Sequence, residues 1–149
     1  MNFQRLEVQI MNDEGFSAKP YLDTVDVPTI GYGSTHILGT PVTMTQETIS
    51  PAVARGLLRS ELYGACVDAQ GLCSVFDSLS DVRQEVLANM AYTLGKTRLS
   101  GFTKFLNALD MQDYSAAAVE MLDSKWAKQV KGRANRLADA MRTGQWANG

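Results

Sequence analysis

Apolar residues recur at helical spacing through most of the chain, starting close to its first residue. Phe3, Leu6 and Ile10 lie three and four residues apart, which predicts an amphipathic helix over residues 2–14. Gly15 follows directly, and glycine readily adopts the left-handed conformation with which helices commonly end. The last residue of this predicted helix is therefore an acidic one.

Between residues 16 and 43 the helical spacing is lost, and short runs such as Val25 to Gly33 are separated by turn-forming residues. The prolines and glycines that interrupt this part of the chain are Pro20, Pro28, Gly31, Gly33, Gly39 and Pro41. Such punctuation is typical of small strands and turns. This segment is the only one for which the pattern predicts a sheet.

Two longer helices follow the predicted sheet. Ser50 and Pro51 predict the start of a helix over residues 51–69, because serine caps helix N-termini and proline fits the first helical position. Ser80 caps the next helix, which ends at Gly95 and is expected to be central to the core. Its wide apolar stripe consists of Val82, Val86, Leu87, Met90 and Leu94.

Shorter helices are predicted at about 101–111, 115–122 and 124–130, and a last one at 132–143 that stops at Gly144. These elements indicate a mostly helical α+β fold. A length of 149 residues with 45% apolar residues fits one domain over residues 1–149. We expect two lobes, with the N-terminal helix and sheet at about 1–49, a connecting helix at 51–69 and a helical lobe at 70–149.

The net charge of −2 conceals an asymmetry, because residues 1–74 carry a net charge of −4 and the remainder +2. The late positive charge comes mainly from Lys125, Lys128, Lys131, Arg133, Arg136 and Arg142. Such a run is typical of a solvated helix face, and it also suits an anionic polymer as a partner.

Composition excludes several other classes of protein. No apolar run approaches the roughly 20 residues of a membrane-spanning helix, and Arg5 and Glu7 interrupt the segment where a signal peptide would be apolar. We therefore expect no stable membrane insertion, no signal peptide and synthesis in the cytoplasm. Cys66 and Cys73 favour buried thiols over a disulfide. With His36 as the only histidine, no metal site and no cofactor are expected.

Glu14, Asp23 and Thr29 are the candidates for chemistry. The helix macrodipole disfavours the charged form of a carboxyl at a helix C-terminus, which suits Glu14 as a general acid. An aspartate in a polar loop stays ionised. Glycosidases use two carboxyls in different environments, one as the general acid and the other as the base or nucleophile. Spacing alone is also compatible with an ordinary helix end, turn pair and strand residue.

Three stretches keep a fixed order and spacing around these residues: Asp13-Glu14-Gly15-Phe16, Tyr21-Leu22-Asp23-Thr24 and Thr29-Ile30-Gly31-Tyr32-Gly33. They resemble the active-site segment of the phage lysozymes, the endolysin muramidases of glycoside hydrolase family 24. The resemblance continues through Phe76-Asp77-Ser78-Leu79, Asn89-Met90, Gly101-Phe102-Thr103, Ser124-Lys125-Trp126, Arg133-Ala134-Asn135-Arg136 and Arg142-Thr143-Gly144-Gln145-Trp146. Nearly the whole chain is covered.

The resemblance implies a lysozyme-like fold with peptidoglycan in the cleft between two lobes. It implies a muramidase that hydrolyses the β-1,4 bond between N-acetylmuramic acid and N-acetylglucosamine and lyses the host cell for phage release. Glu14 would be the general acid, Asp23 the general base that orients water, and Thr29 a second group that positions the water. That assignment predicts inversion at the anomeric carbon, with the two carboxyls roughly 6.5–9.5 Å apart.

Further roles follow from the same resemblance. Arg133 matches an arginine that pairs with the catalytic glutamate, and Tyr21 is expected to support the site. Tyr92 matches an aromatic position of the cleft. Phe105 and Glu120 stand where the family has a cleft serine and asparagine, so they are expected to bind substrate with altered recognition of the peptide stem. Trp126 and Trp146 are expected in the core.

The sequence also departs from the family near the site. Ser34 replaces the usual histidine after the Gly-x-Gly turn, and His36 stands two places later, so no imidazole is expected at the family's supporting position. The segment Val25-Asp26-Val27-Pro28 replaces a glycine-containing hairpin turn. Altered geometry is therefore expected beside Asp23.

Two alternatives remain open. A lytic transglycosylase would cleave the same bond and form 1,6-anhydro products, although it has less use for Asp23 and Thr29. A non-catalytic wall-binding module is the second. A nucleic-acid partner is not expected, because the sequence pI is about 5.3. A monomer is expected that reaches peptidoglycan from the host cytoplasm after a separate holin permeabilises the membrane.

Overall fold

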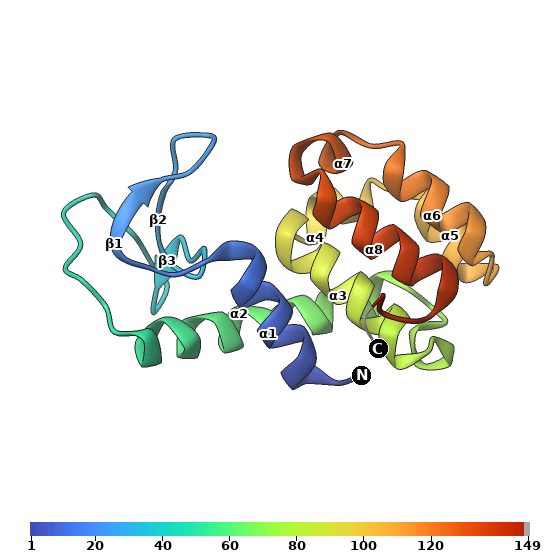
Figure 1. The fold of residues 1–149 in the computed structure, drawn as a ribbon, viewed down its shortest axis with the longest axis horizontal. Helices are drawn as coiled ribbons and strands as arrows, with labels where there is room; N and C mark the ends of the chain where they lie inside the picture. The colour runs from blue at the N-terminus through green and yellow to red at the C-terminus, as the bar shows by residue number, and fades with distance from the viewer. Residues whose placement is uncertain (148–149) are drawn as a thin grey trace. The chain divides into compact units, whose positions relative to one another are not determined.

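The computed structural model describes residues 1–147, so the last two residues of the predicted domain lie outside the described part (Figure 1). Helices and two small antiparallel sheets confirm the predicted α+β fold. In chain order the elements are α1 (Phe3–Glu14), β1 (Ser17–Leu22), β2 (Pro28–Gly31), β3 (His36–Ile37), β4 (Thr40–Pro41), α2 (Pro51–Leu72), a 3-10 turn (Phe76–Ser78), α3 (Asp81–Leu94), α4 (Lys96–Ser100), α5 (Thr103–Asp110), α6 (Tyr114–Leu122), α7 (Lys125–Val130) and α8 (Gly132–Thr143).

The chain forms two compact units. The N-terminal unit comprises Gln4–Tyr63, and the helical unit comprises Met1–Phe3 together with the chain from Gly64 onward. The division falls inside α2, which continues three residues beyond its predicted end at residue 69.

In the N-terminal unit, α1 and α2 are built as the apolar pattern predicts. Leu6 and Ile10 are fully buried, and α1 ends at Gly15, which has a φ of +71° and donates its N–H to the carbonyl of Met11 at 3.0 Å. The hydroxyl of Ser50 accepts the N–H of Val53 at 3.2 Å and caps α2. Both predicted helix boundaries are thus set by local hydrogen bonds.

Two ion pairs join these helices, each between the buried carboxylate of Glu7 and a partly exposed guanidinium. Glu7 is 1% exposed on α1, and its carboxylate accepts hydrogen bonds from Arg55 and from Arg59 on α2, the latter at 2.9 Å. Burial opposes ionisation of Glu7, but the two guanidiniums outweigh it and hold the pKa of this carboxyl below its usual value. The ion pairs fix α1 against α2, because separating the helices would leave a buried charge without its partners.

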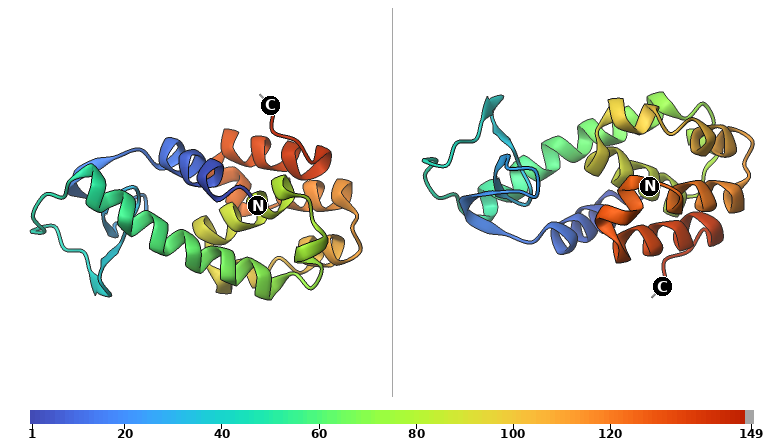
Figure 2. Two further views of the ribbon diagram at one scale, coloured as in Figure 1. Left: turned by 90° about the horizontal axis from the view of Figure 1, so that it is seen from below. Right: turned by 90° about the horizontal axis from the view of Figure 1, so that it is seen from above.

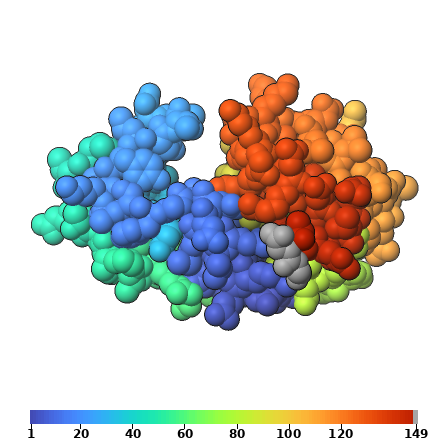
Figure 3. Space-filling model, viewed as in Figure 1, coloured from blue at the N-terminus to red at the C-terminus, as the bar shows by residue number. Residues whose placement is uncertain are grey.

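The sheet that carries the candidate site consists of β1 and β2. These strands are antiparallel, with Tyr21 opposite Thr29 and Leu22 opposite Pro28, and the register shifts between Ser17 and Tyr21. The segment between Leu22 and Pro28 forms a turn at the surface of the unit, visible in Figures 1 and 3. A second, smaller hairpin is formed by β3 and β4.

In the helical unit, α3 is the central helix, as its apolar stripe predicts. Val86, Leu87 and Met90 are fully buried, and the hydroxyl of Ser80 caps the helix by accepting the N–H of Arg83 at 3.3 Å. Helices α5, α6 and α8 pack side by side, as Figures 1 and 2 show, and α7 and α8 cover much of the visible face of this unit in Figure 3.

The apolar pattern does not predict two short elements of this unit, α4 and the 3-10 turn. Helix α4 has only five residues, and a segment of that length cannot show a helical period. It follows Gly95, which has a φ of +81° and caps both the end of α3 and the start of α4, and its buried residue is Leu99. One glycine therefore serves as the end of one helix and the start of the next.

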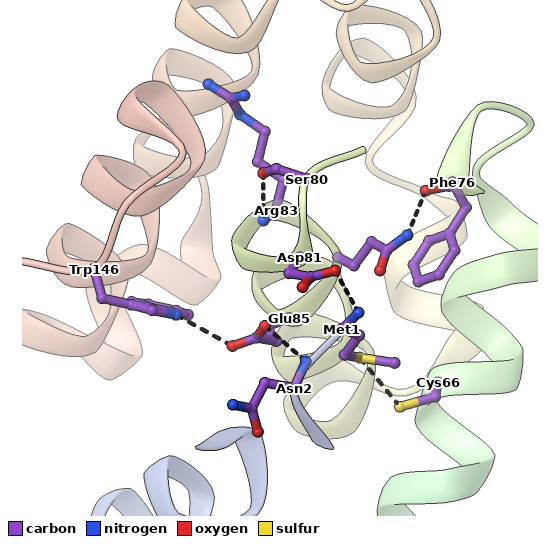
Figure 4. Close-up of polar contacts among 10 residues, drawn as sticks. Met1, Asn2, Cys66, Phe76, Ser80, Asp81, Arg83, Glu85 and Trp146 are labelled. Atoms are coloured by element: carbon purple, nitrogen blue, oxygen red, sulfur yellow. Dashed lines mark hydrogen bonds and ion pairs between the residues drawn. The ribbon is translucent and has the colours of Figure 1, made fainter. Parts of the chain in front are cut away.

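Polar contacts gather around the first turns of α3 (Figure 4). The amino group of Met1 pairs with Asp81 Oδ1 at 2.6 Å. Glu85 is fully buried and accepts two hydrogen bonds, one from the N–H of Asn2 at 3.1 Å and one from the indole N–H of Trp146 at 3.2 Å. Glu85 thus joins the first residues of the chain and the segment after α8 to α3.

The tryptophans and cysteines lie in this unit. Trp126 is 1% exposed and belongs to the core, whereas Trp146 is half-buried and is held by its polar contact with Glu85. Cys66 and Cys73 are free thiols, and burial raises the pKa of both. Within residues 1–147, no helix combines the length and apolar character needed to cross a membrane.

The ion pairs of Glu7 generate a stability prediction. We expect Glu7→Gln to lower the free energy of unfolding by roughly 1–3 kcal/mol at pH 7, because both guanidiniums lose their charged acceptor. Since the pKa of Glu7 lies below its ordinary value of 4.5, this contribution is present above pH 4.5 and is lost as the pH falls further through the lowered pKa. Urea denaturation of both proteins at neutral and acidic pH measures the difference.

Glu47→Gln is the matched control, because Glu47 is an exposed glutamate of the same unit. It should leave the unfolding free energy within about 0.5 kcal/mol at either pH. A difference between wild type and Glu7→Gln that stayed constant into acid would contradict the electrostatic role of Glu7.

Candidate active site

Glu14 is placed by the end of α1 and by a glycine of the turn after β2. Glu14 is the last residue of the helix and is half-buried. Its carboxylate lies against Gly33, where a methyl group on the glycine would come within 3.1 Å of Glu14 Oε2. Gly33 has a φ of +90°, a conformation that favours glycine. The absence of a side chain at Gly33 therefore leaves room for the carboxylate.

Asp23 closes the turn between β1 and β2 with its own side chain. Its Oδ1 accepts the N–H of Val25 at 2.9 Å and the N–H of Val27 at 2.8 Å. The backbone completes the turn, since Asp23 donates its N–H to the carbonyl of Val27 at 3.0 Å. Both side-chain bonds use Oδ1, so that, among the described residues, Oδ2 keeps its lone pairs for an outside group. The altered turn expected from the sequence is thus an Asx-type turn.

Thr29 lies on β2, directly opposite Tyr21 of β1. It is 3% exposed, and its Oγ1 donates a hydrogen bond to the carbonyl of Val27 at 2.8 Å. A hydroxyl has one proton and two lone pairs. Because the proton of Thr29 is committed to Val27, its oxygen can only accept a hydrogen bond from a further partner.

Tyr21 connects the three candidates. It is the cross-strand partner of Thr29, it is half-buried, and burial together with the negative charges of Glu14 and Asp23 raises the pKa of its phenol. Both carboxyls therefore act on the same hydroxyl. The N-terminal unit brings together Glu14, Tyr21, Asp23 and Thr29, all of which the sequence predicts as site residues.

Ser34, which stands in place of the family histidine, is part of the scaffold. It is 1% exposed, exchanges two backbone hydrogen bonds of 2.9 Å with Ile30, and donates its hydroxyl to Glu61 Oε2 at 3.1 Å. His36 is exposed and its Nδ1 lies 2.9 Å from the hydroxyl of Thr35. The sequence does not predict the contact of Ser34 with Glu61, because the two residues are 27 positions apart and no local pattern links them.

Two of the predicted substrate-binding residues lie together in the helical unit. Phe105 and Glu120 both line an open cavity of about 400 Å³, whose other lining residues are Gly101, Phe102, Thr103, Lys104, Asp123 and Ser124. Phe105 is 1% exposed and its ring meets that of Phe102 edge to face, with centroids 6.4 Å apart. Tyr92 is half-buried on α3 and is not among the lining residues.

Arg133 is the second residue of α8 and connects this helix to α3. It donates a hydrogen bond to Thr93 Oγ1 at 3.3 Å, and Thr93 donates its own proton to the carbonyl of Asn89 at 3.0 Å. The basic residues between Lys125 and Arg142 do not all lie on one solvated face. The lysines among them are exposed, whereas Arg133 and Arg136 are half-buried. Within residues 1–147, no three His, Cys, Asp or Glu side chains gather as a metal site would require.

Comparison with known proteins agrees with the resemblance of the motifs. The family model described as Phage lysozyme matches residues 11–141. An endolysin of Acyrthosiphon pisum secondary endosymbiont phage 1 is 30% identical over 131 residues, which cover 87% of this chain and 83% of that protein.

Two further relatives are longer than this chain. The pre-baseplate central spike protein Gp5 of Enterobacteria phage T4 is 27% identical over 157 residues, which cover 91% of this chain and 27% of that protein. The probable T4-type lysozyme 2 of Dictyostelium discoideum is 28% identical over 86 residues, which cover 58% of this chain and 51% of that protein. The chain thus spans about a quarter of the spike protein's length and about half of the Dictyostelium protein's.

The contact between Gly33 and Glu14 generates a prediction. Gly33→Ala and Gly39→Ala should each cost about 1–2 kcal/mol of stability, because both glycines have a left-handed φ. Only Gly33→Ala adds a methyl group against Glu14, whereas the methyl group added at Gly39 would meet nothing within 4 Å beyond its chain neighbours. Gly33→Ala alone should therefore shift the ¹³C resonance of the Glu14 carboxyl. An unshifted resonance, or an equal shift in Gly39→Ala, would show that the contact does not position Glu14.

Proposed function

Because the chain belongs to the phage lysozyme family and is thereby a lysozyme, a glycosidase, we propose that it hydrolyses the β-1,4 bond between N-acetylmuramic acid and N-acetylglucosamine in bacterial peptidoglycan. One observation carries the proposal. The N-terminal unit gathers Glu14, Asp23 and Thr29 around Tyr21, whose phenol responds to both carboxyls and whose strand partner is the threonine. Two carboxyls and a hydroxyl are sufficient for glycoside hydrolysis.

Glu14 is the general acid in this proposal. Its proton passes to the glycosidic oxygen as the bond between that oxygen and the anomeric carbon breaks, so the leaving sugar departs as a neutral alcohol. The position of Glu14 at the end of α1 and the bare backbone of Gly33 support this role, since a side chain at Gly33 would crowd the carboxylate.

Asp23 and Thr29 position and activate the water. A water molecule has two protons, and the free Oδ2 of Asp23 and the accepting Oγ1 of Thr29 offer one acceptor for each. The lone pair of the water then faces the anomeric carbon. As the water attacks, Asp23 takes its proton, and attack on the face opposite the leaving group inverts the configuration.

The biological setting belongs to the same proposal. The substrate is the bacterial wall, which the protein degrades to lyse the host cell. It acts as a monomer and passes from the host cytoplasm to the wall after a separate holin opens the membrane. The exposed Lys125, Lys128 and Lys131 would attract an anionic wall, an effect that salt weakens.

Carboxamide substitutions test the two carboxyls. Glu14→Gln and Asp23→Asn should each lower kcat by roughly 10²–10⁴-fold, because each removes a proton donor or acceptor while keeping the shape of the side chain. The amide oxygen of the asparagine in Asp23→Asn still accepts the two turn N–H groups, so the melting temperature of this variant should change little. The measurement is the clearing rate of a wall suspension.

Asp26→Asn is the control for these variants, because Asp26 is exposed in the same turn and asparagine tolerates its φ of +61°. It should retain the wild-type rate. Clearing by Glu14→Gln at a rate comparable to wild type would refute the role of Glu14.

The products distinguish hydrolysis from the alternatives. We expect a new reducing end released first as the inverted anomer, seen by rapid NMR, and muropeptides with the mass of hydrolysed products. Retained configuration would count against Asp23 as the base. Products one water lighter would identify a lytic transglycosylase, and wall binding without any product would identify a non-catalytic module.

A further inference from the structure

Tyr21 occupies a position that the mechanism above does not use. It lies near the end of β1 opposite Thr29, so its side chain shares a face of the sheet with the threonine, and directly opposed residues have Cβ atoms roughly 4.5–5.5 Å apart. The register of the pair shifts between Ser17 and Tyr21. Such bulges commonly re-aim a side chain beside a functional site.

Tyr21 precedes Asp23 by two positions and lies opposite Thr29, and the charges of both candidate carboxyls act on its phenol. Its ring is half-buried, and after burial itself the causes that raise the pKa of the phenol are the charges of Glu14 and Asp23, in that order. The raised pKa keeps the hydroxyl protonated through the neutral range. Tyr21 therefore presents a neutral hydrogen-bond donor where both acidic groups converge.

In an inverting hydrolysis, the space between the acid and the base is occupied by the sugar whose bond is cleaved. The acid and the base act from opposite faces of this sugar. A hydroxyl within the influence of both carboxyls borders the same sugar. A neutral donor can bind a sugar oxygen there without adding a charge that would change the ionisation of either carboxyl.

We propose that Tyr21 is a substrate-contacting residue whose hydroxyl donates a hydrogen bond to an oxygen of the sugar held between Glu14 and Asp23. This inference rests on the proposed function. The sugar changes shape as it approaches the oxocarbenium-like transition state, and a donor fixed by the strand pairing gains strength only for the geometry it fits. Its contribution should therefore appear in kcat.

Removal of one oxygen atom tests the inference. Tyr21→Phe keeps the ring and its packing, and it should lower kcat for purified peptidoglycan roughly 10- to 100-fold with little change in KM. The matched control is Tyr114→Phe, which removes a hydroxyl in the helical unit and keeps the ring 3.6 Å from the Arg83 guanidinium carbon. The control should retain wild-type kcat. Thermal melting of both variants reports their folded fraction.

A spectroscopic measurement adds a second criterion. In Glu14→Gln protein with ¹³C-labelled tyrosine, a disaccharide-peptide dimer prepared from the wall should shift one Cζ resonance, the one absent from the Glu14→Gln/Tyr21→Phe double variant. Wild-type kcat in Tyr21→Phe, a loss only in proportion to the unfolded fraction, or an unshifted Tyr21 resonance in the saturated complex overturns the inference. Failure of the proposed function looks different, because the wild-type protein would then release no hydrolysed product.

Discussion

The carboxylate of Asp23 is the constraint on which the candidate site depends. Its Oδ1 accepts the N–H groups of Val25 and Val27 and so closes the turn between β1 and β2. This turn fixes the register in which Tyr21 lies opposite Thr29. A shift of one residue would send Thr29 to the other face of the sheet. One oxygen of Asp23 is therefore structural, which leaves the other for chemistry. The local architecture and the proposed activity share a single side chain.

The second constraint acts along α1. Glu7 and Glu14 are seven residues apart, almost two full turns, so they lie close to the same face of the helix. The ion pairs of the buried Glu7 carboxylate with Arg55 and Arg59 fix the rotation of α1 about its axis, and this rotation determines the direction of Glu14. Charge pairs without a catalytic role thereby support the candidate acid. Gly33 completes the arrangement, because any side chain at that position would press on the Glu14 carboxylate.

In the helical unit, local contacts set the helix ends, whereas contacts distant in sequence determine which side chains are buried. Ser80, Ser124 and Gly144 set helix ends through bonds to residues three or four positions away, and these ends could be predicted from sequence. The burial of Phe105 and Glu85 could not. Glu85 is an acidic residue on a helix, and its complete burial involves contacts with Asn2 and Trp146, which lie far from it in the sequence. The late basic run was likewise a single feature in sequence, and the packing of α8 on α3 divided it.

The sequence by itself determined the longer helices, the position of the small sheet, the family and the identity of the candidate residues. Helical periods, caps and motif spacing are encoded within a few positions of each residue, because the hydrogen bonds that express them are local. Tertiary structure decided which groups meet. The contacts of Glu7 with Arg55 and Arg59 span 48 and 52 positions, and those of Glu14 with Gly33 and of Ser34 with Glu61 are also distant in sequence. Such pairings depend on how helices and strands pack, and no local pattern records them.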